Sequence, residues 1–254
     1  LEVRQYLSQA FGKGLIQNGR LHIKGDPNQV PYPNRASGEF SLNLPIVDTT
    51  FNPSPLLPIE RGMWSALENM SGTVSMDQAA LLVDINQANF KSVKLTAAKA
   101  QIKDVSAKNL MLTLNAQLNG EAAEILEYLY ASPFGKKEVD VAKNLRVNGL
   151  VNGTLDANIP LGNKGDLKID AKVSLPDNTA RWGKLPPLEK LKGKIRITEM
   201  YPEFEDISAN FMGGSIRIAS APSSSGNSIF SIHGDVDAKL LQSHFAPNPI
   251  LQAM

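Results

Sequence analysis

The stretch Leu-Met-Leu-Thr-Leu-Asn-Ala-Gln-Leu, residues 110–118, decides the fold of this chain. Apolar residues occupy every even position, and Met, Thr, Asn and Gln alternate with them. Successive side chains of an extended strand point to opposite faces, so this strand has one apolar face and one mainly polar face. The same period recurs from Leu21 to Val236, interrupted mainly by Gly, Pro, Asn and Asp. The sequence therefore predicts one large antiparallel sheet.

The same alternation in other segments predicts strands over most of the chain. The predicted strands cover residues 21–23, 40–46, 74–76, 81–85, 93–97, 110–118, 145–151, 155–161, 167–175, 194–197, 215–218 and 229–233. Apolar stripes with helical spacing predict short amphipathic helices over residues 3–11, 121–131 and 237–245, which stop at Gly12, Pro133 and Pro247. One or two helical turns are also expected between residues 52 and 70, over the end of the sheet.

An apolar face that extends over many strands can occur in three structural arrangements. Helices can cover it, the sheet can close on itself, or the face can stay open as a groove for an apolar ligand. We expect the third: a mainly β fold with a long, curved antiparallel sheet that forms an open hydrophobic groove. The alternative is an ordinary sandwich core packed under the helices. The residues expected to line the concave side, which would face the apolar ligand, are Leu112, Leu114, Leu118, Leu155, Ile159, Ile169, Val173, Ile195, Ile197, Ile216 and Ile218.

Composition narrows the possible partners. The 254 residues can hold one large all-β unit or two average domains. Lys and Arg total 26, Asp and Glu total 25, and no run of like charge occurs, so nucleic acid is not an expected partner. The absence of cysteine excludes a disulfide framework and a thiolate site. No apolar run is long enough for a spanning helix, so we expect a piece of a longer protein, whose anchor lies elsewhere.

Two stretches of the chain resemble each other. Trp64 leads to Gly72-Thr-Val-Ser-Met, and Trp182 leads to Gly193-Lys-Ile-Arg-Ile; downstream, residues 103–107 match residues 205–209. Internal repeats of this kind indicate tandem units stacked along one axis. We therefore predict a first β-groove unit with an N-terminal helix over residues 1–135 and a second over residues 136–254, continuous with the first.

No arrangement of reactive side chains predicts an enzyme, a metal site or a cofactor. The three histidines, His22, His233 and His244, lack ligand spacing. The glycines at 12, 14 and 19 follow a helix and lack the Gly-Lys-Ser/Thr ending of a phosphate loop. Asp104 and Asp206 hold equivalent places in the two repeats and are expected to end strands or satisfy turns. The two tryptophans, Trp64 and Trp182, are expected to cap the end of the sheet.

The order of short motifs resembles the YhdP family of large periplasmic proteins of Gram-negative bacteria, in the AsmA-like group that includes TamB. The motifs that carry the resemblance are Ala10-Phe-Gly-Lys-Gly14, Gly19-Arg-Leu-His-Ile-Lys-Gly25, Pro31-Tyr-Pro33, Gly38-Glu-Phe40, Ile102-Lys-Asp104, Ser132-Pro133 and Gly213-Gly214, together with the two Trp-to-Gly stretches. The resemblance covers most of the chain, from about residue 5 to residue 220. The family's Trp-Pro element is absent, because Ser65 and Gly183 follow the tryptophans.

The resemblance implies a protein anchored in the inner membrane by a segment outside this chain, with a long β-groove that crosses the periplasm. It also implies a role in moving phospholipid toward the outer membrane. The expected partners are phospholipid acyl chains and the remainder of the longer chain. A rival function is a structural or adaptor domain of the envelope that supports outer-membrane assembly through a strand edge. A carbohydrate-binding module is less consistent with the composition, because two Trp offer few stacking platforms.

Overall fold

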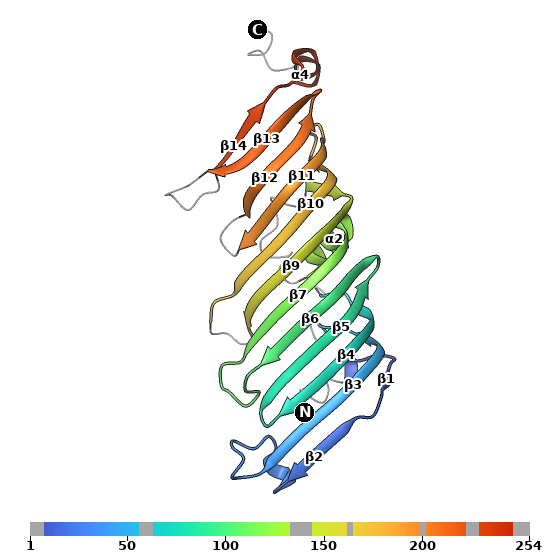
Figure 1. Ribbon diagram of the computed structural model, residues 1–254, viewed down its shortest axis with the longest axis vertical. Coiled ribbons are helices and arrows are strands. Elements are labelled where there is room, and N and C mark those ends of the chain that lie inside the picture. The colour runs from blue at the N-terminus through green and yellow to red at the C-terminus, as the bar shows by residue number, and fades with distance from the viewer. Residues whose placement is uncertain are drawn as a thin grey trace.

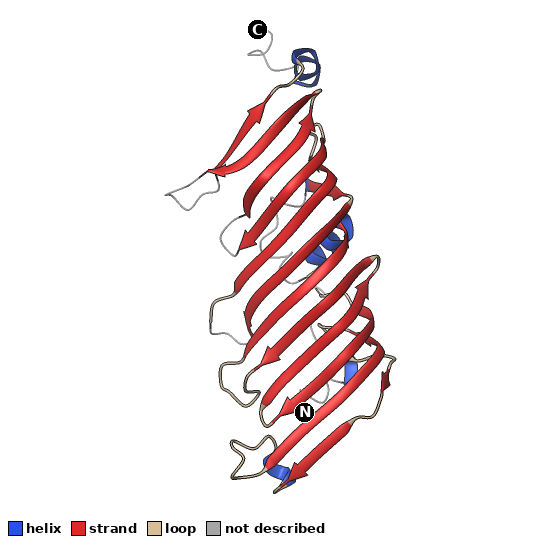
Figure 2. Ribbon diagram, in the orientation of Figure 1, coloured by secondary structure: helices blue, strands red, loops and turns tan. Residues whose placement is uncertain are grey.

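The computed structural model describes residues 8–55, 63–132, 144–161, 165–198, 202–221 and 229–245. They form one antiparallel sheet of 14 strands with few helices (Figure 2). The strands are β1 (Leu15–Ile16), β2 (Arg20–Lys24), β3 (Glu39–Phe51), β4 (Leu67–Asp77), β5 (Ala80–Phe90), β6 (Val93–Ile102), β7 (Met111–Glu121), β8 (Leu145–Asn148), β9 (Leu150–Pro160), β10 (Lys168–Trp182), β11 (Leu188–Thr198), β12 (Pro202–Phe211), β13 (Gly214–Ala221) and β14 (Ile229–Gly234). The helices are η1 (Pro27–Gln29), α2 (Ala122–Ala131) and α4 (Ala238–Phe245).

The strands follow one another in nearly the order of the sequence. They run obliquely across the long axis of the molecule, with β2 at one end and β14 at the other (Figure 1). These end strands do not pair with each other, so the sheet is open and not a barrel. The predicted fold class, a long and mainly β antiparallel sheet with a few short helices, is confirmed.

Two strands each pair with more than one partner along the same edge. The first half of β3 pairs with β2 and its middle with β1. In the same way, the first half of β10 pairs with β9 and its end with β8. The sheet continues without a break between the two halves of the chain, because β7 pairs with β9 along eleven consecutive residue pairs, from Met111 with Pro160 to Glu121 with Leu150.

The similarity between the two Trp-to-Gly stretches corresponds to a repeated local structure. Three residues before each glycine the backbone has a positive φ, 50° at Asn69 and 52° at Lys190. A register shift accompanies each of these residues, as at a β-bulge. The glycines, Gly72 and Gly193, then lie in close contact with the next strand. The second half of the predicted likeness is wrong, because residues 103–107 form a turn after β6 while residues 205–209 lie inside β12.

Several predicted elements differ from the structure. Residues 67–70, predicted as helical, belong to β4, and β12 was not predicted as a strand. Strand β10 runs on to Trp182. Helices α2 and α4 are confirmed, each starting one residue later than predicted. Of the predicted helix over residues 3–11, residues 8–10 are helical and residues 3–7 lie outside the described residues.

The hydrophobic core consists of two clusters. The N-terminal cluster contains the buried side chains of Ile46, Met70, Ile85 and Ala88. The C-terminal cluster contains those of Ala122, Val151, Leu175, Ala180, Leu191, Ile207, Ala209 and Ile216. Strands β3 to β5 carry the first, and β9 to β13, together with α2, carry the second. Strands β6 and β7, between these two groups of strands, supply no buried member to either cluster.

Candidate functional site

The strand register places the predicted lining residues on one face of the sheet. Residues directly opposite each other in an antiparallel pair have side chains on the same face. Leu112 is opposite Ile159, Ala116 is opposite Leu155, and Leu118 is opposite Gly153. These apolar pairs define what we call the apolar face. The residues that alternate with them, such as Asn115 opposite Asp156, define the polar face.

The apolar face continues through the strands on the C-terminal side. Ala157 is opposite Ile169, Gly153 is opposite Val173, and Val173 is opposite Ile195. Ile197 follows two residues later on the same face of β11, opposite Ala171. In β13, Ile216 is opposite the buried Ala209 and Ile218 is opposite the buried Ile207 of the C-terminal cluster. All eleven predicted lining residues therefore share one face.

The eleven residues differ in how much of their surface is accessible. Ile216 is buried in the C-terminal cluster, with 4 % of its surface exposed. Val173, Ile195 and Ile218 pack against that cluster and are half-buried. Ile197 is 41 % exposed. The remaining six belong to neither cluster and keep an intermediate exposure; we call Leu112, Leu114, Leu118, Leu155, Ile159 and Ile169 the central lining.

Helix α2 covers one end of the strands on the apolar face. Its first residue, Ala122, is buried in the C-terminal cluster, and Ile125 packs against the same cluster. The backbone N–H of Ala122 donates to the Gly149 carbonyl at 3.0 Å, which ties the start of the helix to the link between β8 and β9. The apolar face is therefore covered near α2, while the residues of the central lining belong to neither core cluster.

An aromatic group fixes the other side of α2 to the first half of the sheet. The Tyr128 ring lies 5.3 Å from that of Trp64 and 4.8 Å from that of Phe90, between ring centroids. Burial raises the pKa of Tyr128 to about 12, because the phenolate would lose its hydration there. The Glu124 carboxylate accepts hydrogen bonds from the Ser92 backbone N–H at 2.9 Å and from its hydroxyl at 2.6 Å. These bonds hold the pKa of Glu124 below its usual value.

The polar face carries cross-strand ladders of amides, hydroxyls and charges. Between β7 and β9, Thr113 donates to Asn158 at 3.0 Å and Asn115 donates to Asp156. Between β10 and β11, Arg196 forms a two-pronged ion pair with Asp170, with both N–O distances 2.9 Å. The Arg196 guanidinium lowers the pKa of the Asp170 carboxyl. The polar side chains of this face therefore pair with one another across the strands.

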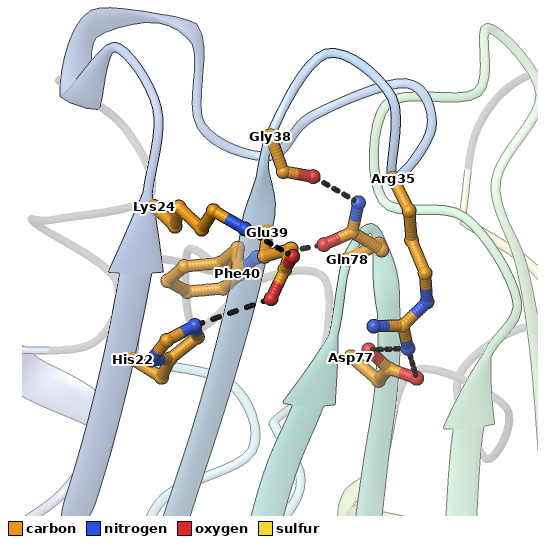
Figure 3. Close-up of polar contacts among 8 residues, drawn as sticks. All are labelled: His22, Lys24, Arg35, Gly38, Glu39, Phe40, Asp77 and Gln78. Atoms are coloured by element: carbon orange, nitrogen blue, oxygen red, sulfur yellow. Dashed lines mark hydrogen bonds and ion pairs between the residues drawn. The ribbon is translucent and has the colours of Figure 1, made fainter.

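Polar contacts join the ends of β2, β3 and β4 to the long loop between β2 and β3 (Figure 3). Glu39 of β3 accepts from Lys24 at 3.1 Å and lies 3.4 Å from His22, both on β2, and these contacts lower the pKa of the Glu39 carboxyl. Arg35 in the loop pairs with Asp77 at 2.8 Å, where β4 turns into β5. These contacts hold the loop against the strand ends. They do not pair a nucleophile with a base.

The Gln78 side chain joins the same loop to β3. Its Oε1 accepts from the Phe40 N–H at 2.7 Å, and its Nε2 donates to the Gly38 carbonyl at 3.0 Å. The loop also buries Tyr32 completely, and the Tyr32 hydroxyl donates to the Asp26 carbonyl at 2.9 Å. The Pro31-Tyr-Pro33 motif therefore belongs to a loop that is packed around the Tyr32 side chain.

The other residues singled out in the sequence have structural roles. Asp104 accepts from the backbone and hydroxyl of Ser106 in the turn after β6, as predicted, whereas Asp206 lies in a bulge inside β12 with a φ of 50°. Trp64 packs on α2, and Trp182 ends β10 with 43 % of its surface exposed. Within the described residues, no group of three His, Cys, Asp or Glu side chains could hold a metal ion.

Sequence reasoning left several residues of the apolar face unassigned. Val74, Val83 and Ala98 lie on it in the first half of the chain, where register connects them to Leu114 through Ala100. The period-two pattern of residues 81–85 was the signal that could have included them. Phe204 and Phe230, whose ring centroids are 4.9 Å apart, extend the face to its C-terminal end. Phe204 was missed because charged residues surround it in β12.

Comparisons with known proteins give one match. A family model described as YhdP protein matches residues 2–254, almost the whole chain. No curated protein and no solved structure matches. Among the residues that the structure describes, no helix has the length and apolar character needed to span a membrane.

Proposed function

Because the chain belongs to the YhdP family, we propose that its apolar face conducts phospholipid between the inner and outer membranes. In this proposal the chain is a non-enzymatic, periplasmic segment of a longer protein, whose anchor in the inner membrane lies outside it. The acyl chains lie along the apolar face, and the headgroup stays in water at the open side. The observation that carries the proposal is the central lining, whose six apolar side chains remain accessible outside both core clusters.

The energetic reason for such a surface is the cost of exposing acyl chains to water. At about 0.8 kcal/mol per methylene, a sixteen-carbon chain costs on the order of 12 kcal/mol when it leaves a bilayer. Leu112, Leu114 and Ile159 lie on adjacent strands, so the apolar contact passes from β7 to β9 without a polar residue between them. A chain that slides across these strands exchanges one apolar contact for another and avoids most of that cost.

Site-specific photocrosslinking tests the proposal. A photoreactive residue replaces Leu114 on the apolar face, and a matched variant carries it at the next residue, the exposed Asn115 on the polar face. The protein is irradiated in Gram-negative cells and analysed by mass spectrometry. We expect phospholipid adducts from position 114 and none from position 115. If positions 112, 114, 155 and 159 all give no adduct in folded protein, lipid conduction is wrong and a scaffold role remains.

A charge substitution provides a second readout. Leu114→Asp places a carboxylate in the central lining, while Thr113→Asp places the same group on the polar face of the same strand. The first variant is expected to lose co-purifying phospholipid in native mass spectrometry, and the second is expected to keep it. Circular dichroism of both variants verifies that the sheet is formed.

A further inference from the structure

The apolar face is not equally accessible along each strand. On the side of the sheet where α2 lies, the strands from β4 to β11 carry buried residues on this face, among them Met70, Ala88, Val93, Val151, Ala180 and Leu191. The opposite ends of the same strands, at the lower left in Figure 1, carry large apolar side chains that belong to neither core cluster. One long margin of the apolar face is therefore accessible among the described residues.

The accessible strand ends form a continuous row, which we call the rim stripe. It consists of one residue from each of β4, β5, β6, β7 and β9: Met76, Leu81, Ile102, Leu112 and Ile159. Each residue is directly opposite the next one in the register of the sheet. All five have an intermediate exposure, and none is part of a core cluster or packs against one. The stripe thus crosses five strands as an accessible line of large apolar side chains.

The neighbouring row, one step closer to α2, has a different character. It consists of Val74, Val83, Ala100, Leu114 and Ala157, again each opposite the next. Val74 and Val83 pack against the N-terminal cluster, and the two alanines offer little surface. In this row only Leu114 combines a large side chain with a place outside the core. The rim stripe offers this combination on every strand that it crosses.

The apolar line continues diagonally onto β10 and β11. Ile169 is opposite Ala157 and is therefore the diagonal neighbour of Ile159. Ile197, which is 41 % exposed, is opposite Ala171 and is the diagonal neighbour of Ile169. Diagonal neighbours on one face of a sheet remain within reach of long side chains. Adjacent strands lie about 4.8 Å apart, so the line from β4 to β11 is roughly 29 Å long, more than an extended sixteen-carbon chain.

A polar turn borders the stripe. Directly after Ile102, the side chains of Lys103, Asp104 and Ser106 are exposed, and Asp104 accepts hydrogen bonds from the backbone N–H and the hydroxyl of Ser106. An apolar row beside a hydrated turn suits a phospholipid, because its acyl chains avoid water and its charged headgroup requires water. Nearer to α2, burial leaves less apolar surface for an acyl chain to contact.

We infer that acyl chains follow the rim stripe across the strands, with the headgroup beside the turns at the same margin. The inference rests on the proposed function and narrows it from the whole apolar face to the margin opposite α2. Leu95 and Leu118, which are opposite each other on β6 and β7, share the apolar face but lie closer to α2. They are outside the inferred path.

Photocrosslinking at four matched leucines tests this path. A photoreactive residue replaces Leu81 or Leu112 of the rim stripe, or Leu95 or Leu118 nearer to α2. All four leucines are half-buried and lie on the apolar face. The full chain is irradiated in Gram-negative cells, and mass spectrometry measures the yield of phospholipid adducts and locates each crosslink on the acyl chain or the headgroup. We expect several-fold more acyl-chain adduct from positions 81 and 112 than from positions 95 and 118.

The outcomes separate this inference from the proposed function. Equal adduct yields from the four positions would overturn the inference and leave lipid conduction standing, because acyl chains would then spread over the whole apolar face. Crosslinks to the headgroup instead of the acyl chain at positions 81 and 112 would also overturn it. A lack of adducts at all four positions, and at the positions of the central lining, would contradict the proposed function and this inference together.

A charge substitution measures the same path without a crosslink. Ile102→Asp interrupts the rim stripe, whereas Leu118→Asp places the same carboxylate on the same face nearer to α2. Native mass spectrometry is expected to show a several-fold loss of co-purifying phospholipid in the first variant and retention in the second. Circular dichroism verifies folding, and Ile102→Asn with Leu118→Asn replaces the pair if a carboxylate unfolds the chain. Equal losses from two folded variants would exclude a path confined to the margin.

Discussion

The Nδ2 atom of Asn178 lies 2.9 Å from the place that a Cβ atom on Gly149 would occupy. Gly149, with a φ of 100°, is the link between β8 and β9. The Asn178 amide donates to the carbonyls on both sides of this link, those of Asn148 and Leu150, at 3.1 Å each. Asn178 therefore stabilises the link at which the pairing partner of β10 changes from β9 to β8.

Replacement of Asn178 by alanine is expected to destabilise the protein. The side chain is 1 % exposed, and its loss leaves the carbonyls of Asn148 and Leu150 without their part-buried amide donor. Leaving a buried polar group unpaired costs about 1–3 kcal/mol. Urea unfolding measures the difference in the free energy of unfolding. Asn210→Ala, at an exposed position of β12, is the control and should cost less than about 0.5 kcal/mol. Equal effects of the two variants would contradict the role of Asn178.

Gly193→Ala tests the close approach of β11 to β12. An added Cβ would lie 2.8 Å from the Asp206 carbonyl oxygen and 2.9 Å from the Ile207 Cα. The φ of 135° also disfavours a side chain. We expect a loss of about 1–3 kcal/mol in the free energy of unfolding. In Gly12→Ala the nearest atom lies 3.3 Å away, so this control should lose less stability than Gly193→Ala. A native-like Gly193→Ala would show that the strands can separate there at little cost.

The contact between Glu124 and Ser92 makes the anchoring of α2 dependent on pH. Hydrogen bonds from Ser92 lower the pKa of Glu124 in the folded state. The stabilisation is therefore present above the unfolded pKa, near 4.5, and is lost as the pH falls through the lower folded value. Urea midpoints of the native chain and of Glu124→Gln should differ at pH 7 and converge in acid. Glu205→Gln, at an exposed carboxylate of β12, serves as the control. A constant difference at every pH would exclude this linkage.

The raised pKa of Tyr128 predicts that the protein loses stability at high pH. Because burial raises its pKa from 10 to about 12, the folded state retains the proton that the unfolded state loses. Stability is fully present below pH 10 and falls as the pH rises toward 12, by roughly 2–3 kcal/mol in total. Ultraviolet absorbance of the phenolate gives the pKa directly, and Tyr128→Phe should remove this part of the alkaline loss. A normal pKa for Tyr128 would show that water reaches the ring.

Alternation of apolar residues was sufficient to predict most strands, but bulges hid part of the fold. Trp64, Leu67 and Met70 have helical spacing, which led to the prediction of helical turns. In the structure the positive φ of Asn69 forms a bulge in β4, and Met70 is buried in the N-terminal cluster beside Leu67. A bulge adds one residue to the period of two, so a strand acquires the three-residue spacing of a helix.

The sequence was sufficient to predict which face of the sheet the lining residues occupy. It was not sufficient to predict how deeply each of them is buried. Leu114 and Ile216 occupy equivalent places in their alternating patterns, yet one lies in the central lining and the other in a core cluster. The difference depends on which segments, far away in sequence, cover each strand. Ile216 packs in a cluster that includes Ala122 of α2, and nothing in the residues around Ile216 signals this contact.

The nearly sequential order of the strands has a consequence for folding. With few exceptions, each ladder joins strands that are neighbours in the chain, and the longest detour is the passage through α2 and β8 between β7 and β9. Contacts of short sequence separation close small loops, and such topologies fold faster than β-sandwiches of similar stability. The sheet can therefore grow hairpin by hairpin from one end while the rest of the polypeptide is still unstructured.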